Sequence, residues 1–241
     1  MLNKAHWTLL PVALVTELQH LRLSPLGVIP QQARRPRSIV DYTFSGVNGN
    51  TVLLAPNEAM QFGHALQRLL SKILHADPRF GPVYICKINI ADGFYRIWLL
   101  PWDIPKLGVL FPTPPGTPPL IAFPLTLPMG WVESPPYFSA ATETIADLAN
   151  TAFASSVIPP PHRLDDVSES PIAHTPLLLA PPSQSAVHPP ARHRPLGHRH
   201  ARKPLAYTDV YVDDFITVVQ GPPQCRKLVK RKLLHSLDRV F

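Results

Sequence analysis

The chain of 241 residues carries a formal charge of +7, which favours an anionic partner, with nucleic acid as the first candidate. Its hydrophobic content of 45% is typical of a globular protein, and one domain with a long insertion fits the length as well as two domains do. Cys86 and Cys225 are the only cysteines in the sequence, which argues against a disulfide framework or a cysteine-based zinc site.

The first apolar stretch, residues 7–15, is far shorter than a membrane span and is interrupted by Pro11. It also lacks a small-residue cleavage site after a basic region, as a secretory signal would have. We interpret it as the first buried segment of the fold, or as the edge of a truncated one. We therefore expect no membrane partner and a location in the cytoplasm or the nucleus.

The next two segments predict short strands and then a helix. Residues 24–48 combine loop and strand patterns around a basic cluster that includes Arg37. Residues 57–76 space their apolar side chains as a helix does, and Asn57 is placed to cap its start.

Strand patterns then dominate before a second helix. Residues 83–100 favour strand, with an interruption at 91–93, and a further short strand is expected near 120–123. Two prolines at 135–136 precede a good helical pattern over 137–148. Proline suits the start of a helix because its missing N–H would be unpaired there in any case.

Residues 151–205 differ in kind from the rest of the chain. They contain eleven prolines with Ser, His and Arg between them, and no helical or strand period. We interpret them as a disordered insertion or linker. His193, His198 and His200 fit a solvated basic stretch better than a metal site, since no cysteines or rigid frame accompany them.

The last part of the chain predicts a β-hairpin followed by a basic helix. Tyr-Val-Asp-Asp at residues 211–214 lies between β-branched runs, so the acidic pair is expected at or beside a tight turn. A rigid tip of this kind presents two hard oxygen ligands, which suit Mg²⁺. The helix, 224–240, has an apolar side and a cationic side, the latter formed by Arg226, Lys227, Lys230, Arg231 and Lys232.

Three further segments precede this hairpin in a characteristic order. Val-Asp-Tyr at residues 40–42 follows the basic cluster, residues 87–97 run from a strand into a turn with an aromatic residue, and residues 127–138 form a glycine-containing loop that enters a helix. Together with the hairpin, they resemble the reverse transcriptases of retrotransposons and retroviruses. The resemblance extends from about residue 21 to the end of the chain and leaves out 151–205.

The resemblance implies an α+β fold, a right-hand polymerase whose palm is a small antiparallel sheet backed by helices. Residues 1–150 would hold the fingers and the first part of the palm, 151–205 the insertion, and 206–241 the rest of the palm. Because the chain stops at Phe241, we expect the thumb and a ribonuclease H domain to be absent. The implied partners are an RNA or DNA template-primer and dNTPs.

The resemblance also implies a catalytic site. In this family, carboxylates from the hairpin and the preceding strand hold two Mg²⁺ ions, which serve the primer 3′-hydroxyl and the leaving pyrophosphate. Asp213 and Asp214 match the hairpin's metal ligands, while the first catalytic Asp of the family falls on Asn89. An amide offers one neutral oxygen instead of a charged, bridging carboxylate. We therefore expect the ions to bind weakly and polymerisation to be weak or absent.

A nucleotide-binding group follows from the same resemblance. Phe94 would exclude a ribose 2′-hydroxyl, Arg37 would contact the triphosphate, and the loop with Met129 and Gly130 would line the nucleotide. Asp92 joins this group but is a poor substitute for the lost ligand, because its offset of three residues from the catalytic strand position points to the other face. Each residue also has an ordinary interpretation: core packing for the aromatic, surface charge for the arginine, and a turn for the glycine.

Three functions remain open at this point. The first is a reverse-transcriptase fragment of a retroelement polyprotein, impaired by Asn89 and the missing thumb. The second is a catalytically dead, nucleic-acid-binding remnant, which salt-dependent binding to a primer-template without extension would favour. The third is a degraded reading frame, which a broad, non-cooperative melting transition would favour.

Overall fold

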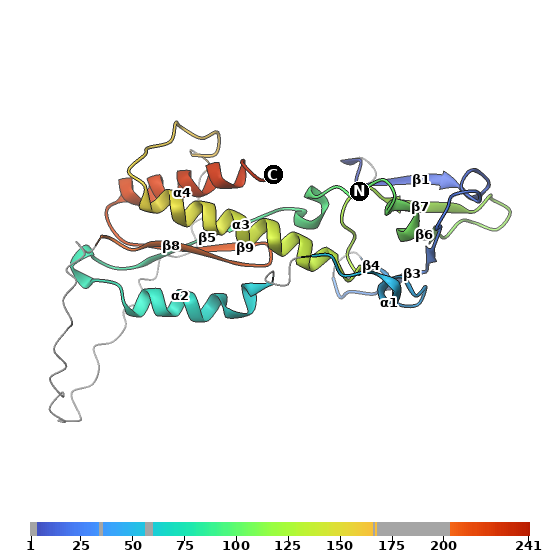
Figure 1. The fold of residues 1–241 in the computed structure, drawn as a ribbon, viewed down its shortest axis with the longest axis horizontal. Helices are drawn as coiled ribbons and strands as arrows, with labels where there is room; N and C mark the ends of the chain where they lie inside the picture. The colour runs from blue at the N-terminus through green and yellow to red at the C-terminus, as the bar shows by residue number, and fades with distance from the viewer. Residues whose placement is uncertain (1–3, 34–35, 56–59, 166, 168–202) are drawn as a thin grey trace, which may run out of the picture.

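A computed structural model describes residues 4–33, 36–55, 60–165, 167 and 203–241 of the chain. The fold is mixed α+β, as predicted, and has two parts (Figure 1). One part is a three-stranded sheet with the three longest described helices around it, and the other contains a four-stranded sheet and a separate two-stranded hairpin.

The three-stranded sheet carries the predicted hairpin. Its strands β5 (Tyr84–Asn89), β9 (Asp214–Val219) and β8 (Ala206–Tyr211) lie in the order β5-β9-β8 and are antiparallel throughout. Alternate side chains of these strands face opposite sides of the sheet, and Val210 and Phe215 belong to the main core. The predicted hairpin and the strand that ends at Asn89 therefore lie side by side.

Helices cover both faces of this sheet. Figure 1 shows α3 (Ser134–Ala154) and α4 (Pro223–Leu237) on one face and α2 (Ala65–Leu74) on the other. The core between the sheet and helices α3 and α4 includes the buried side chains of Ile145 and Leu233. Burying such side chains is the main favourable term for holding this layer together.

The second part of the fold is built from the N-terminal segments and the middle of the chain. Its sheet has the order β1-β7-β6-β2, and only the β2–β6 pair is parallel. Beside it lies the β3–β4 hairpin. The elements are β1 (Trp7–Pro11), β2 (Leu23–Ser24), β3 (Leu26–Ile29), β4 (Arg37–Val40), β6 (Gly108–Phe111), β7 (Leu120–Pro124) and the short α1 (Val47–Asn50).

Several predicted elements have different bounds. The helix expected over 57–76 is α2 alone, preceded by the 3₁₀ turn η3 (Gln61–His64) and by Met60 with a left-handed φ of 72°. The proposed cap, Asn57, lies outside the described residues. The strand expected after the 91–93 interruption is instead a 3₁₀ turn, η5 (Gly93–Arg96). Further 3₁₀ turns are η2 (Val12–Leu14), η4 (Pro78–Phe80) and η6 (Ile104–Leu107).

The cationic side predicted for the last helix is wrong at Lys232. This side chain is buried, and its Nζ donates to the carbonyl oxygens of Ala152 at 2.8 Å and Ser155 at 2.7 Å. These carbonyls belong to the end of α3, where helical hydrogen bonds run out and the helix dipole attracts a cation. Burial lowers the pKa of this ammonium group. Lys232 therefore caps α3 instead of facing solvent.

The start of the predicted insertion is part of the described fold. Helix α3 continues to Ala154, and residues 155–165 pack against α4, where His162 Nε2 lies 2.9 Å from Asp238 Oδ2. Residues 168–202, which include His193, His198 and His200, lie outside the described residues. None of the helices within the described ranges combines the length and apolar character needed to cross a bilayer.

Candidate functional site at the hairpin tip

The acidic pair lies at the tip of the β8–β9 hairpin, as predicted. Tyr211 and Asp214 form its last antiparallel pair, which leaves Val212 and Asp213 as a two-residue turn. Val212 has a φ of +59°, a conformation that suits glycine and is strained for a β-branched residue. Such strain typically costs about 1–3 kcal/mol and persists where the surroundings hold the turn in place.

The end of β5 fixes this turn. The backbone N–H of Ile90 donates to the carbonyl oxygen of Asp213 at 3.0 Å, which extends the β5–β9 pairing to the tip. One residue earlier, Asn89 stands directly opposite Asp214, and its Nδ2 donates to Oδ1 of this aspartate at 2.8 Å. Asn89, which the resemblance aligns with the family's first catalytic aspartate, is thus in contact with the carboxylate of Asp214, to which it presents an amide donor.

Lys87 also reaches this carboxylate, and sequence reasoning missed it. Its Nζ lies 2.7 Å from Asp214 Oδ2. Partial burial pushes the pKa of the Asp214 carboxyl upward, but hydrogen bonds from Lys87 and Asn89 outweigh this effect, and the pKa is lowered overall. Lys87 could have been identified from the strand period, because it lies two residues before Asn89 and residues two apart on one strand share a face.

These residues, as arranged, do not fit a pair of Mg²⁺ ions. Such a pair needs several carboxylate oxygens free to face the metal. Both oxygens of Asp214 already accept protein donors. Asp92, exposed at a left-handed φ of 56°, forms an ion pair with Lys4. Within the described part of the chain, no three His, Cys, Asp or Glu side chains form a group able to hold a metal ion.

The predicted aromatic, Phe94, packs beside the core. Its ring centroid lies 4.8 Å from that of Phe138, which is fully buried in the first turns of α3. A Cβ atom on Gly93 would lie only 2.6 Å from Cζ of the same Phe138, so the turn after β5 can approach the helix only because residue 93 is glycine. The β5 turn and the start of α3 are therefore tightly joined.

The glycine loop before α3 contacts the β4 region. Gly130 has a φ of +98°, and a Cβ atom there would lie 2.9 Å from the carbonyl oxygen of Val40. Nη2 of Arg37, on β4, lies 4.0 Å from Sδ of Met129. The structure thus brings Arg37, Met129 and Gly130 together in one group.

Asn48 holds this loop and was not predicted. Its Nδ2 donates to the carbonyl oxygen of Gly130 at 3.0 Å, and its Oδ1 accepts from the backbone N–H of Val132 at 3.0 Å. A single side chain that satisfies both backbone groups fixes the loop's course. The sequence carried only a weak signal for this role, an asparagine shortly after the 40–42 segment.

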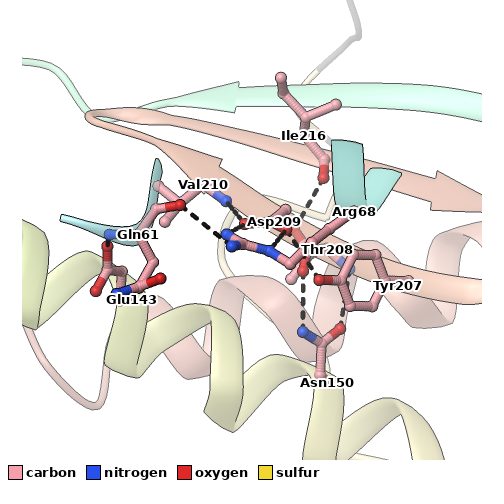
Figure 2. A network of polar contacts seen from close by, with 9 residues as sticks. All are labelled: Gln61, Arg68, Glu143, Asn150, Tyr207, Thr208, Asp209, Val210 and Ile216. Carbon is pink, nitrogen blue, oxygen red and sulfur yellow. Dashed lines mark hydrogen bonds and ion pairs between the residues drawn. The ribbon is translucent and has the colours of Figure 1, made fainter. Parts of the chain in front are cut away.

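Helix α2 holds the other strand of the hairpin. Figure 2 shows Arg68 reaching Asp209 on β8, with Nε–Oδ2 and Nη2–Oδ1 distances of 2.7 and 2.8 Å. The hydroxyl of Tyr207 donates to the same carboxylate at 2.9 Å. At the tip, the ring of Tyr211 packs edge-on against Phe62, at a centroid distance of 5.5 Å. The side of β8 that carries these three residues is thus fixed to the α2 region along its length.

The outer edge of β8 is capped by a side chain from α3. Asn150 donates through Nδ2 to the carbonyl oxygen of Thr208 at 2.9 Å and accepts from its backbone N–H through Oδ1, also at 2.9 Å (Figure 2). An edge strand otherwise leaves such groups unpaired and prone to associate with other chains. Asp209 could have been singled out as a carboxylate within a predicted strand, whereas no feature of the sequence marks Asn150 for this role.

A hollow of about 590 Å³ lies apart from the tip, between the α1 region and the start of α3. Its wall includes Trp98, Trp102, Trp131 and the buried Glu133, whose Oε2 accepts from the backbone N–H groups of Leu54 and Ala55. The hairpin carboxylates do not line it.

No protein-family model matches the chain, and no curated protein matches it either.

Proposed function

We propose that the chain is the fingers and palm portion of a reverse-transcriptase-type polymerase whose nucleotidyl transfer is impaired. The observation that carries this proposal is the pairing of Asn89 with Asp214 at the tip of a three-stranded antiparallel sheet. The sheet is backed by α3 and α4, which agrees with a palm, and Asn89 occupies the position at which this family has a catalytic carboxylate. Arg37 beside Met129 is consistent with a nucleotide-contacting group.

The impairment follows from the donors at the tip. The amide of Asn89 points an N–H at Asp214, where the family's arrangement has a third negatively charged ligand. A cation that approached this carboxylate would have to displace both that N–H and the ammonium group of Lys87. The loss of one carboxylate and the occupation of another both lower the affinity for divalent ions.

A primer-extension assay tests the proposal. We expect the unaltered chain to extend a DNA primer on an RNA template barely above background in Mg²⁺ or Mn²⁺, and Asn89→Asp to raise extension at least tenfold, about 1.4 kcal/mol in the barrier. The matched control is Asn89→Asp combined with Asp213→Asn, which should return to background and so exclude a contaminating polymerase. Robust extension by the unaltered chain, or no gain in Asn89→Asp, would contradict the proposal.

Binding of nucleic acid without catalysis is the second candidate function. It is favoured by the neutralised state of Asp214, which leaves less negative charge at the tip to repel a phosphate backbone. Salt-dependent binding of a primer-template by the unaltered chain, together with no extension by Asn89→Asp, would support this candidate over the first.

A further inference from the structure

Lys87 lies where a long side chain on β5 can reach across to β9. It is two residues before Asn89, so both side chains project from the same face of the strand. Asn89 is directly opposite Asp214, and Lys87 is opposite Ile216, which makes Lys87 and Asp214 diagonal neighbours across the strand pair. Nζ of Lys87 lies 2.7 Å from Oδ2 of Asp214.

This contact differs from an ordinary surface ion pair. Exposed pairs are usually weak because both side chains are solvated and mobile. Here the Lys87 side chain is 54% exposed, but the Asp214 side chain is only 25% exposed, and its second oxygen is held at 2.8 Å by an amide from the same strand as Lys87. Two donors from one rigid strand thus occupy both oxygens of one carboxylate at the tip of a hairpin.

We propose that Lys87 is the built-in counter-cation of Asp214: its ammonium group neutralises this carboxylate in the free protein and competes with divalent cations for it. The inference rests on the proposed function only in treating the hairpin tip as a polymerase site. The competition itself is a property of Lys87 and Asp214. The ammonium group of Lys87 thus lowers the affinity for divalent cations independently of the amide at Asn89.

The size of the effect follows from simple electrostatics. A divalent ion bound to Asp214 would lie within about 5 Å of the ammonium group, and at that distance the repulsion is enough, even in water, to change an affinity about tenfold. Removal of the positive charge should therefore tighten cation binding by about this factor. If the ammonium group moved away from the ion instead, its contact with Asp214 would be lost. The free energy of that contact would then also count against binding of the ion.

Binding of Mn²⁺ alone tests the inference, with the full chain and without nucleic acid or nucleotide. Free Mn²⁺ is measured by electron paramagnetic resonance for Lys87→Met, in both the unaltered and the Asn89→Asp background. We expect Lys87→Met to bind Mn²⁺ about tenfold more tightly than its parent in each background. Lys87→Arg, which keeps the charge, should stay within about twofold of the parent.

Two controls make the result specific to this contact. Lys72→Met removes the same charge from α2, where Lys72 lies over the Tyr207 ring, and should change Mn²⁺ affinity by less than about twofold. Lys87→Met combined with Asp214→Asn should lose the gain. Circular dichroism checks the folding of each variant, and Lys87→Gln, which also removes the charge, takes the place of Lys87→Met if the latter does not fold.

The inference is overturned if the charge-removing variant binds Mn²⁺ no more tightly than Lys72→Met, or if the gain persists without the Asp214 carboxylate. Primer extension separates it from the proposed function. If Asn89→Asp with Lys87→Met gains Mn²⁺ affinity but does not extend a primer, the counter-cation stands and the polymerase proposal fails.

Discussion

Arg68 and Asp209 join helix α2 to the hairpin strand β8 through two hydrogen bonds, of 2.7 and 2.8 Å (Figure 2). The two residues are 141 positions apart in the sequence. The carboxylate is almost fully buried, with a side-chain exposure of 5%, while the arginine side chain is 35% exposed. Asp209 lies two residues before Tyr211, so this ion pair fixes the strand just before the tip of the β8–β9 hairpin.

Loss of Arg68 should destabilise the fold by leaving a buried charge poorly paired. We expect Arg68→Met to lower the free energy of unfolding by about 1–3 kcal/mol, less than for a fully buried pair because solvent screens the arginine. Asp209→Asn in the same chain should recover part of this loss, since the neutral amide needs no counter-charge. Urea denaturation of both single variants and the double variant measures the coupling.

Lys72→Met, one turn further along α2, serves as the control for Arg68→Met. Its ammonium group lies 4.9 Å from the centre of the Tyr207 ring, and such an exposed contact is worth about 0.5–1 kcal/mol. Equal losses in Arg68→Met and Lys72→Met, or additive losses in the Arg68–Asp209 cycle, would contradict a specific role for the ion pair.

The sequence predicted what is local and periodic. Patterns a few residues long predicted three elements: the hairpin with Asp213 at its turn, the strand up to Asn89 and the helix after Pro135. The α+β class of fold came instead from the family resemblance carried by the order of the four segments, and the structure agrees with that class. Patterns of this kind could even have identified Lys87, which shares a strand face with Asn89.

Contacts between distant segments could not be predicted in this way. Lys232 has the sequence signature of a solvated cation, yet the end of α3, which lies 80 positions away at Ala152, provides carbonyl groups that make its burial favourable. Asn48 and Asn150 are ordinary polar residues in the sequence, and only the packing places unpaired backbone groups beside them. These roles depend on tertiary geometry, which a single sequence does not contain.

The α3 cap leads to a second prediction on stability. Lys232→Met removes both hydrogen bonds to the carbonyl groups of Ala152 and Ser155 and should lower the free energy of unfolding by about 1–2 kcal/mol. The end of α3 should fray first, which amide hydrogen exchange would detect as faster exchange in its last turn.

Lys227→Met is the matched control for Lys232→Met, since Lys227 is exposed on the same helix. It should change the stability by no more than about 0.5 kcal/mol. If the two variants unfold at the same urea concentration, the buried ammonium group does not stabilise the end of α3.

Gly130 provides a prediction for the loop at the predicted nucleotide group. Its φ of +98° strains any other residue, and a Cβ atom would in addition lie 2.9 Å from a backbone oxygen, that of Val40. Gly116 isolates the first effect, because it has a φ of +82° with no atom within 4 Å of the added Cβ. We expect Gly116→Ala to cost about 1 kcal/mol and Gly130→Ala about 2–4 kcal/mol, the difference arising from the backbone contact. Equal losses in urea denaturation would show that the β4 strand yields freely, so that the loop does not need glycine for its close approach to Val40.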